Sequence, residues 1–409
     1  MDRISLKYGS EKIELDVPEA ADLLRVKEPA YNISHEDFTA RLNSLIGERT
    51  ISGSVAIVVA DKTRLCGYNQ ILPWVVDVLQ KRHVDQSDIT FYIAYGTHPP
   101  QSDEECLHAY GDVYDHYTFV HHDCHDINDF RKLGETKRGT PVLVRHELCD
   151  AALILTIGAV SHHYFAGYGG GRKLIFPGLG ERSSIYTNHR LFLDAENGTL
   201  APGCQPGNLQ GNPLADDLEE VHGMLPPYIS IHGILDSKGK VATFSFGSSY
   251  DDFREVCKEL DACYKIKAQQ SYDVVVASAG GFPKDINFIQ AHKSVHNAAK
   301  LVGDGGTLIV LTECRDGIGS QTFLPYFEMG GWQQTFAHLA NDYAGNGGTA
   351  LAMMEKTGRI TIKLVTELTT ELCEKIGASK ISATEAGELV STTIGKIAVI
   401  DNASLLVAE

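Results

Sequence analysis

The sequence predicts an α/β protein with two domains, each built on a mostly parallel sheet that is flanked by helices. Its 409 residues exceed the usual size of a single domain. Short apolar runs rich in Val and Ile alternate with segments whose apolar residues recur at helical spacing, as in folds with parallel sheets. The runs are continuously apolar, which indicates strands that are covered on both faces.

The first part of the chain contains predicted strands and helices at regular intervals. A strand over residues 1–8 turns back into a second strand over residues 12–17. A helix is expected over residues 72–81, where Pro73 is tolerated because it falls in the first turn. Another helix is expected at the acidic run that follows Ser102. Further strands are predicted over residues 54–60, 89–95 and 151–157.

The last third of the chain repeats this pattern. Strands are predicted over residues 273–278, 307–311 and 396–400, and a helix over residues 286–302 that stops at Gly303. A polar segment over residues 263–271 suggests a domain boundary. We therefore expect a first domain over residues 1–265 and a second over residues 266–385. The final segment, residues 386–409, suits either domain, and we expect it to return to the first.

Composition restricts the class of partner. The nine cysteines are odd in number and never form a Cys-x-x-Cys pair, which is typical of reduced thiols in a cytosolic enzyme. Because 53 acidic residues outnumber 36 basic ones, the net charge is −17, which argues against nucleic acid and anionic membranes. Long apolar segments and a signal peptide are absent from the sequence, so we expect a cytoplasmic protein.

Unusual residues gather just after the predicted strands. Asp61-Lys62-Thr63-Arg64 follows the strand over residues 54–60, and Gly96-Thr97-His98 follows the strand over residues 89–95. A glycine-rich loop follows Ile157. In open α/β sheets, ligands bind just beyond the carboxyl ends of the strands. These segments therefore mark the expected site.

The glycine-rich segment over residues 161–180 contains the densest group of candidates. Gly169, Gly170 and Gly171 let the backbone approach a ligand and present N–H groups to an anion. Lys173 follows Arg172, whose charge disfavours the protonated amine, and a partly neutral amine is a nucleophile. Two alternatives are a purely structural turn and a cation pair that neutralises a phosphate. The segment matches neither a Walker loop nor a Gly-x-Gly-x-x-Gly turn that opens a helix.

Histidines supply the second group of candidates. His98, His163 and His189 suit proton transfer near neutral pH or metal binding, although a hydrogen-bonded structural role is common for any one of them. The run over residues 121–125 contains three more histidines. Its strand-like start should scatter the side chains, so we expect no metal site there.

A polar pair lies on the predicted helix over residues 286–302. Gln290 and Lys293 are three residues apart, so they share a helix face and are candidates to hold a carboxylate together. The alternative is the polar face of an ordinary surface helix.

Together, these segments resemble the nickel-pincer lactate racemase family over most of the chain. The matching pieces include Asp61-Lys62-Thr63-Arg64, Gly96-Thr97-His98, His163-Tyr164-Phe165-Ala166-Gly167-Tyr168-Gly169-Gly170-Gly171-Arg172-Lys173, Asn188-His189 and Gln290-Ala291-His292-Lys293. The central piece is long and specific. The others are weak alone, but their order and spacing fit.

The resemblance implies a cofactor and a site in the cleft between two domains. The cofactor is nickel held by a pyridinium-3-thioamide-5-thiocarboxylic acid mononucleotide, the nickel-pincer nucleotide, attached covalently to Lys173. His189 would be a nickel ligand. Asp61, Thr63, Gly169, Gly170, Gly171 and Arg172 would line the cofactor. Cofactor-biosynthesis enzymes are implied as partners for maturation.

The resemblance also implies a reaction, the inversion of C2 of a 2-hydroxyacid such as lactate or a larger relative. Hydride moves to and from the cofactor while His98 and His163 act as opposed acid and base. Arg64, Gln290 and Lys293 would bind the substrate carboxylate. Two alternatives remain, a nicotinamide-dependent 2-hydroxyacid dehydrogenase and a non-catalytic protein that binds a nucleotide cofactor.

Overall fold

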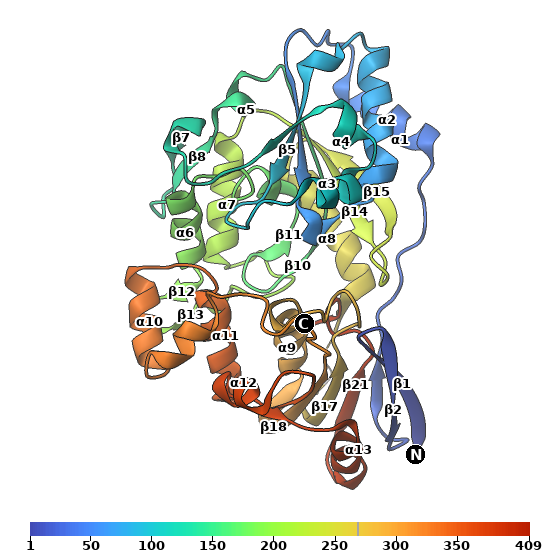
Figure 1. The fold of residues 1–409 in the computed structure, drawn as a ribbon, viewed down its shortest axis with the longest axis vertical. Helices are drawn as coiled ribbons and strands as arrows, with labels where there is room; N and C mark the ends of the chain where they lie inside the picture. The colour runs from blue at the N-terminus through green and yellow to red at the C-terminus, as the bar shows by residue number, and fades with distance from the viewer. Residues whose placement is uncertain (268–269) are drawn as a thin grey trace. The chain divides into compact units, whose positions relative to one another are not determined.

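The computed structural model describes residues 1–267 and 270–409. The chain divides into two compact units (Figure 1). The central unit contains Glu28–Leu191 and Asn208–Leu260, and the terminal unit contains Met1–Lys27, Phe192–Gly207 and Asp261–Glu409.

A six-stranded sheet forms the core of the central unit, in the order β15-β14-β9-β4-β5-β6. All neighbours are parallel except β14 and β15, which form an antiparallel edge pair. Every residue of β4 is buried, as its continuous apolar run predicts. The strands are β4 (Val55–Ala60), β5 (Ile89–Ala94), β6 (Thr118–His121), β9 (Leu153–Ala159), β14 (Ile229–Leu235) and β15 (Val241–Gly247).

Helices and short hairpins complete the central unit. The helices are α1 (His35–Ile46), α2 (Tyr68–Lys81), α3 (Asp103–Tyr110), α4 (Val113–His116), α5 (His146–Asp150), α6 (Arg182–Arg190), α7 (Pro213–Met224) and α8 (Tyr250–Tyr264), whose last turn crosses into the terminal unit. Two antiparallel pairs lie in the connections between strands of the sheet: β7 (Phe130–Glu135) with β8 (Pro141–Arg145), and β10 (Ser161–His163) with β11 (Gly167–Gly169).

Helix α2 differs from its prediction because it begins at Tyr68, so Pro73 lies inside the helix. The early start follows Gly67, which adopts a left-handed conformation with φ 63°. The Tyr68 hydroxyl accepts from the N–H of Ala60 at 2.7 Å and donates to the carbonyl of Ile157 at 2.8 Å. These bonds join the first turn of α2 to β4 and β9.

A second six-stranded sheet, parallel throughout, forms the core of the terminal unit. Its order is β20-β19-β18-β17-β21-β3. The strands are β3 (Asp22–Leu24), β17 (Tyr272–Ser278), β18 (Val302–Leu311), β19 (Thr361–Val365), β20 (Ser379–Lys380) and β21 (Ile397–Ile400). The helices are α9 (Phe288–Ala299), α10 (Trp332–Asn341), α11 (Gly347–Thr357), α12 (Thr370–Lys375) and α13 (Ala383–Thr392).

Smaller strands also belong to the terminal unit. The N-terminal hairpin of β1 (Asp2–Tyr8) and β2 (Glu11–Val17) packs its apolar residues into the same core as β17 and β18. Two short pairs, β12 (Leu193–Asp194) with β13 (Thr199–Leu200) and β16 (Lys265–Ile266) with β22 (Val407–Ala408), lie in the unit's other segments.

The expected domain division differs from this one in three segments. Residues 192–207 were expected in the first domain but belong to the terminal unit. Residues 1–27 were expected in the first domain, but Leu6 and Leu15 are buried with Val274 and Ile309 in the terminal unit. The segment over residues 386–409 was expected to return to the first domain, but its strand β21 pairs with β17 and β3. The expected boundary over residues 263–271 begins where α8 ends, and it includes residues 268–269, which lie outside the described residues.

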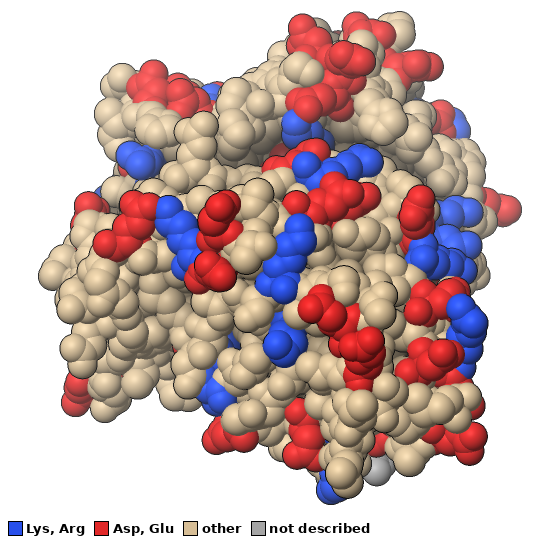
Figure 2. All heavy atoms as spheres, turned by 60° about the horizontal axis from the view of Figure 1, so that its bottom comes forward, with Lys and Arg blue, Asp and Glu red and all other residues tan. Residues whose placement is uncertain are grey.

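The surface carries mixed charges. On the face that Figure 2 shows, Lys and Arg side chains lie among Asp and Glu side chains rather than in a broad basic stripe. None of the helices in the described residues combines the length and apolar character that a membrane span requires.

Candidate active site

Two neighbouring strand ends of the central sheet carry an acidic residue and a histidine. Asp61 follows β4 directly, is 2% exposed and caps the short helix over Lys62–Arg64 by accepting from the backbone N–H and hydroxyl of Thr63. His98 lies in the turn after β5, and its Nδ1 lies 2.7 Å from Oδ2 of Asp61. Because β4 and β5 are parallel neighbours, their carboxyl ends adjoin and make this contact possible.

The protonation state of Asp61 determines which nitrogen of His98 is available. Burial opposes ionisation, but hydrogen bonds from His98 and Thr63 and the charge of Arg64 hold the pKa of the Asp61 carboxyl below its usual range. An ionised carboxylate only accepts, so Nδ1 of His98 donates to it. Nε2 of neutral His98 therefore keeps its lone pair and can act as a base.

The second predicted histidine lies in the β10–β11 hairpin. His163 pairs with Gly167 across the hairpin, and the backbone N–H of Ala166 donates to Nδ1 of His163 at 3.3 Å. Because Nδ1 accepts, neutral His163 carries its proton on Nε2. His98 and His163 are thus set in opposite tautomers, one with a basic Nε2 and the other with an Nε2–H donor.

Two glycines bring the chain from the hairpin into the short helix over Gly171–Leu174. Gly170 has φ 74° and Gly171 has φ 53°, conformations that favour glycine. A Cβ on Gly170 would lie 2.2 Å from the carbonyl oxygen of Ala159, and one on Gly171 would lie 2.6 Å from the ring of Phe253. The close backbone passage therefore requires glycine at both positions.

Arg172 is a buried cation whose hydrogen-bonding capacity is only partly used. It is 3% exposed, and its guanidinium lies 4.6 Å from the ring centre of Phe253 and 5.5 Å from that of Tyr250. Nη2 donates to the carbonyl of Ala166, whereas Nε and Nη1 have no hydrogen-bond partner among the described residues. Buried donors of this kind suit an anionic group, so the site fits the phosphate of a nucleotide.

Lys173 and His189 are both held towards their neutral forms. Burial, then the charges of Arg64 and Arg172, keep the pKa of the Lys173 amine well below its usual range. Burial and the charge of Lys173 lower the pKa of His189 to about 3, and Arg64 and His98 add to this effect. A neutral amine is a nucleophile and a neutral imidazole is a metal ligand, so both residues fit a covalently held metal cofactor.

Phe165 lies between these groups. Its ring centre lies 5.5 Å from Nζ of Lys173 and 5.1 Å from the ring centre of His189. The ring of His163 lies 4.4 Å away. The aromatic ring thus contacts three predicted site residues, although Phe165 itself was not predicted as a site residue.

A buried network of hydrogen bonds holds α6, the helix that carries His189. Asn188 donates from Nδ2 to Oδ2 of Asp217 at 2.8 Å, and the hydroxyl of Thr136 donates to the other oxygen of Asp217. Asn188 and Asp217 are both fully buried. These residues join α6, α7 and the β7–β8 hairpin, and they are too far apart in sequence for spacing to have predicted the contact.

Gln290 and Lys293 belong to the terminal unit. Nζ of Lys293 donates to Oε1 of Gln290 at 3.1 Å, so the two side chains share a face of α9 as their spacing predicted. The N-cap Asn287 accepts from the backbone N–H of Gln290 and fixes the start of the helix.

The geometry argues against a nicotinamide-binding turn in the glycine-rich segment. Such a turn joins a strand directly to a helix whose N-terminus faces the pyrophosphate. Here the strand β9 leads into the β10–β11 hairpin and then into a short helix of four residues. The groups present are instead those that proton transfer beside an anion needs. They are an ionised carboxylate beside a histidine, a second histidine, a lysine held towards neutrality and a buried arginine.

Comparisons with known proteins agree with this class. A model of the lactate racemase N-terminal domain matches residues 8–200, and a model of the lactate racemase C-terminal domain matches residues 266–344. Lactate racemase from Thermoanaerobacterium thermosaccharolyticum is 27% identical over 340 residues, 80% of this chain and 78% of that protein. Lactate racemase from Lactiplantibacillus plantarum is 28% identical over 275 residues, 66% of this chain and 62% of that protein.

Solved structures have the same fold. The lactate racemase apoprotein from Thermoanaerobacterium thermosaccharolyticum aligns over the whole of both chains with a TM-score of 0.87 and 23% identity. A protein from Thermotoga maritima aligns over 93% of this chain and 99% of its own, with a TM-score of 0.70 and 13% identity. The class of protein is an isomerase, and more narrowly a racemase. The chain belongs to the lactate racemase family.

Proposed function

We propose that this chain inverts C2 of a 2-hydroxyacid, lactate or a larger relative. The main support is the ring of Phe165, whose centre lies 4.4 Å from the ring centre of His163, 5.5 Å from Nζ of Lys173 and 5.1 Å from the ring centre of His189. The Asp61–His98 pair supplies the second candidate for proton transfer. Proton-transfer groups therefore lie together with the residues that suit a metal cofactor. The substrate class is taken from two relatives, which are both lactate racemases.

The proposed cofactor is nickel held by the nickel-pincer nucleotide. Lys173 would form the covalent link, His189 would be a nickel ligand, and Arg172 would pair with the phosphate. The backbone of Gly169, Gly170 and Gly171 would lie against the nucleotide, while Asp61 and Thr63 order the adjoining strand end. When bound, this group supplies the hydride acceptor and donor for C2.

His98 and His163 are proposed to exchange the hydroxyl proton of the substrate. Nε2 of His98 takes the proton from the hydroxyl of one enantiomer, and Asp61 stabilises the imidazolium that results. Protonated His163 returns a proton from Nε2 to the oxygen from the other side and becomes neutral. The reaction therefore starts with neutral His98 and protonated His163 and ends with the charges exchanged, which is the starting state for the reverse direction.

Cationic and amide side chains are proposed to hold the substrate carboxylate. Arg64 lies beside Asp61, with Nη1 4.0 Å from Oδ2, and its side chain is half exposed. Gln290 and Lys293 would add an amide and an ammonium from α9. These donors would fix the carboxylate while C2 changes its configuration.

Maturation and location are also proposals. A nucleotide cofactor joined to Lys173 requires cofactor-biosynthesis enzymes as partners. All nine cysteines are free in the described residues, which supports a reducing, cytoplasmic location. The mixed surface charge supports a small-molecule substrate rather than nucleic acid.

The proposal is tested with protein that has been matured by co-expression with the cofactor-making enzymes. Chiral chromatography follows both directions of interconversion over a panel of 2-hydroxyacids. His98→Ala should lower kcat/KM by roughly 10² to 10⁴, because it removes a general base. His108→Ala, at an exposed histidine of α3, is the matched control and should leave the rate unchanged.

Two results would contradict the proposal. A His98→Ala variant with the wild-type rate would remove His98 from the proton transfer. Matured wild-type protein that retains the cofactor yet interconverts no member of the panel would favour the non-catalytic alternative.

A further inference from the structure

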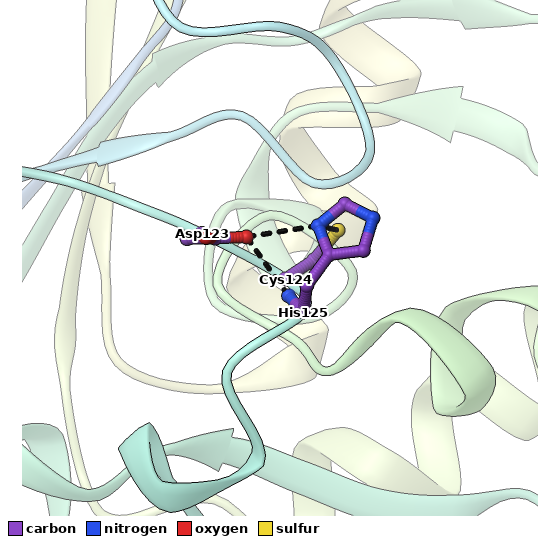
Figure 3. A group of neighbouring side chains, drawn as sticks. All are labelled: Asp123, Cys124 and His125. Atoms are coloured by element: carbon purple, nitrogen blue, oxygen red, sulfur yellow. Dashed lines mark hydrogen bonds and ion pairs between the residues drawn. The ribbon is translucent and has the colours of Figure 1, made fainter.

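A group of three potential metal ligands lies outside the site described above. Beyond β6 the chain leaves the sheet, and Asp123, Cys124 and His125 turn their side chains towards one another (Figure 3). The sequence had suggested that this run would scatter its side chains, but the strand ends at His121 and the next residues form a turn. One ligand atom from each residue lies within 4.8 Å of the other two.

The spacing of the three atoms suits a tetrahedral ion. Sγ of Cys124 lies 3.6 Å from Nδ1 of His125, which lies 2.9 Å from Oδ1 of Asp123. Bonds of about 2.3 Å to sulfur and about 2.0 Å to nitrogen and oxygen would place these pairs roughly 3.5 Å and 3.3 Å apart. The third pair of ligand atoms, from Cys124 and Asp123, lies within 4.8 Å, so rotation of the exposed Asp123 side chain would complete the geometry.

The backbone around the group is held in place from the neighbouring loop. The N–H of Arg182 donates to the carbonyl of Cys124 at 3.0 Å, and Nε2 of His122 lies 3.1 Å from the carbonyl of Gly180. Cys124 is only 3% exposed, so its sulfur has a fixed position beneath two exposed ligands. A site that is already ordered loses little conformational entropy when an ion binds.

An ordinary turn accounts for the positions of two of the three side chains, those of Asp123 and His125, without a metal ion. Asp123 accepts from the backbone N–H of His125 at 2.9 Å, as an aspartate often does in a turn, and it also contacts the imidazole. This arrangement does not require a thiol beside the imidazole. The position of the sulfur is the observation that points to a metal.

We propose that Asp123, Cys124 and His125 bind a divalent transition-metal ion such as Co²⁺, Ni²⁺ or Zn²⁺, with water in the remaining position. One sulfur, one nitrogen and one oxygen ligand select ions of this class over Mg²⁺ and Ca²⁺. As the metal–sulfur bond forms, the thiol proton of Cys124 is released to solvent, with no change of oxidation state. This site does not depend on the function proposed for the chain.

The proposal is tested by titrating Co²⁺ into full-length protein that has been stripped of metal with a chelator. Wild-type protein should bind one equivalent with a thiolate-to-cobalt charge-transfer band, and Cys124→Ser should lose this band. Asp123→Asn and His125→Gln should weaken binding by about tenfold or more, since even an outer-shell partner is worth 10- to 100-fold in metal affinity. Cys149→Ser, at a cysteine outside the group that is partly exposed, should leave the band unchanged.

The controls separate this site from the proposed nickel ligand. His189→Ala should keep the charge-transfer band, and a band that disappears in His189→Ala would place the ion elsewhere. A wild-type protein with no thiolate band, or a Cys124→Ser variant that keeps it, would overturn the proposal. If Cys124→Ser fails to fold, the double variant Asp123→Asn with His125→Gln tests the site instead, because both side chains are exposed and their replacement should leave the fold intact. A double variant that binds Co²⁺ as tightly as the wild type would overturn the proposal.

Discussion

At the scale of single residues, burial and neighbouring charge decide what each histidine can do. His98 is partly exposed and bonded to Asp61, so it suits proton transfer. Burial and the charge of Lys173 lower the pKa of His189 to about 3, which suits a metal ligand. His292, on α9 of the terminal unit, is 1% exposed, and burial together with Lys356 and Lys293 lowers its pKa to about 3.

The buried histidines of α9 should make the stability of the protein depend on pH. His292 and His296 stay neutral in the folded protein because burial lowers both pKa values, whereas unfolded histidine titrates near 6.5. The stability that neutral His292 contributes is therefore complete above about pH 6.5 and is lost as the pH falls towards 3, and His296 acts in the same direction. Each should lower the free energy of unfolding by about 1.4 kcal/mol per pH unit below about pH 6.

Urea unfolding of wild-type protein and of His292→Gln between pH 7 and pH 5 measures this dependence. The stability difference between the two proteins should shrink as the pH falls, because only the wild type has His292 to titrate. Parallel curves for the two proteins would show that His292 is protonated to the same extent in the folded and unfolded states.

At the scale of elements, the last turn of α6 depends on contacts with α7 and the β7–β8 hairpin. Asn188 precedes His189 and is bonded to Asp217, which also accepts from Thr136. The helix that presents the proposed nickel ligand is therefore fixed by a carboxyl group from a different element. Asn212, the N-cap of α7, also donates to the carbonyl of Phe165, so α7 contacts the glycine-rich segment as well.

Asp217→Ala should destabilise the central unit by roughly 3 kcal/mol, because it leaves the buried Thr136 and Asn188 groups without their acceptor. It should also reduce the nickel retained after dialysis, whereas the covalent adduct on Lys173 should persist. Ser230→Ala is the matched control, since it breaks the buried bond from Ser230 to Thr156 on β9 at a cost of about 1 kcal/mol. Urea unfolding and nickel analysis measure both effects, and full nickel retention in Asp217→Ala would contradict the role given to α6.

At the scale of the whole molecule, local patterns identified the strands better than they identified the units. The buried strands β4, β5 and β17 were predictable because their apolar runs are continuous. The membership of β3 and β21 was not, because it depends on parallel pairing between residues 22–24 and 397–400, at opposite ends of the chain. Pairing over such a distance leaves no periodic signal in either segment.

Some contacts of the candidate site could also be predicted from the sequence, and others could not. Asp61 and His98 were predictable as neighbours because each follows the carboxyl end of a strand. The contacts of Arg172 with Tyr250 and Phe253, and of Asn188 with Asp217, join segments that are distant in sequence. Their side chains carry no local motif, so only the folded chain brings them together.

The covalent role of Lys173 is the central claim, and intact mass with nickel analysis tests it most directly. Wild-type protein matured with the cofactor-making enzymes should carry the mass of one nucleotide adduct and, once a chelator has removed ions bound at Asp123–His125, about one nickel per chain. Lys173→Ala should carry no covalent adduct, while Lys62→Ala, at an exposed lysine paired with Glu105, should match the wild type. A Lys173→Ala protein that keeps the full adduct would contradict the account.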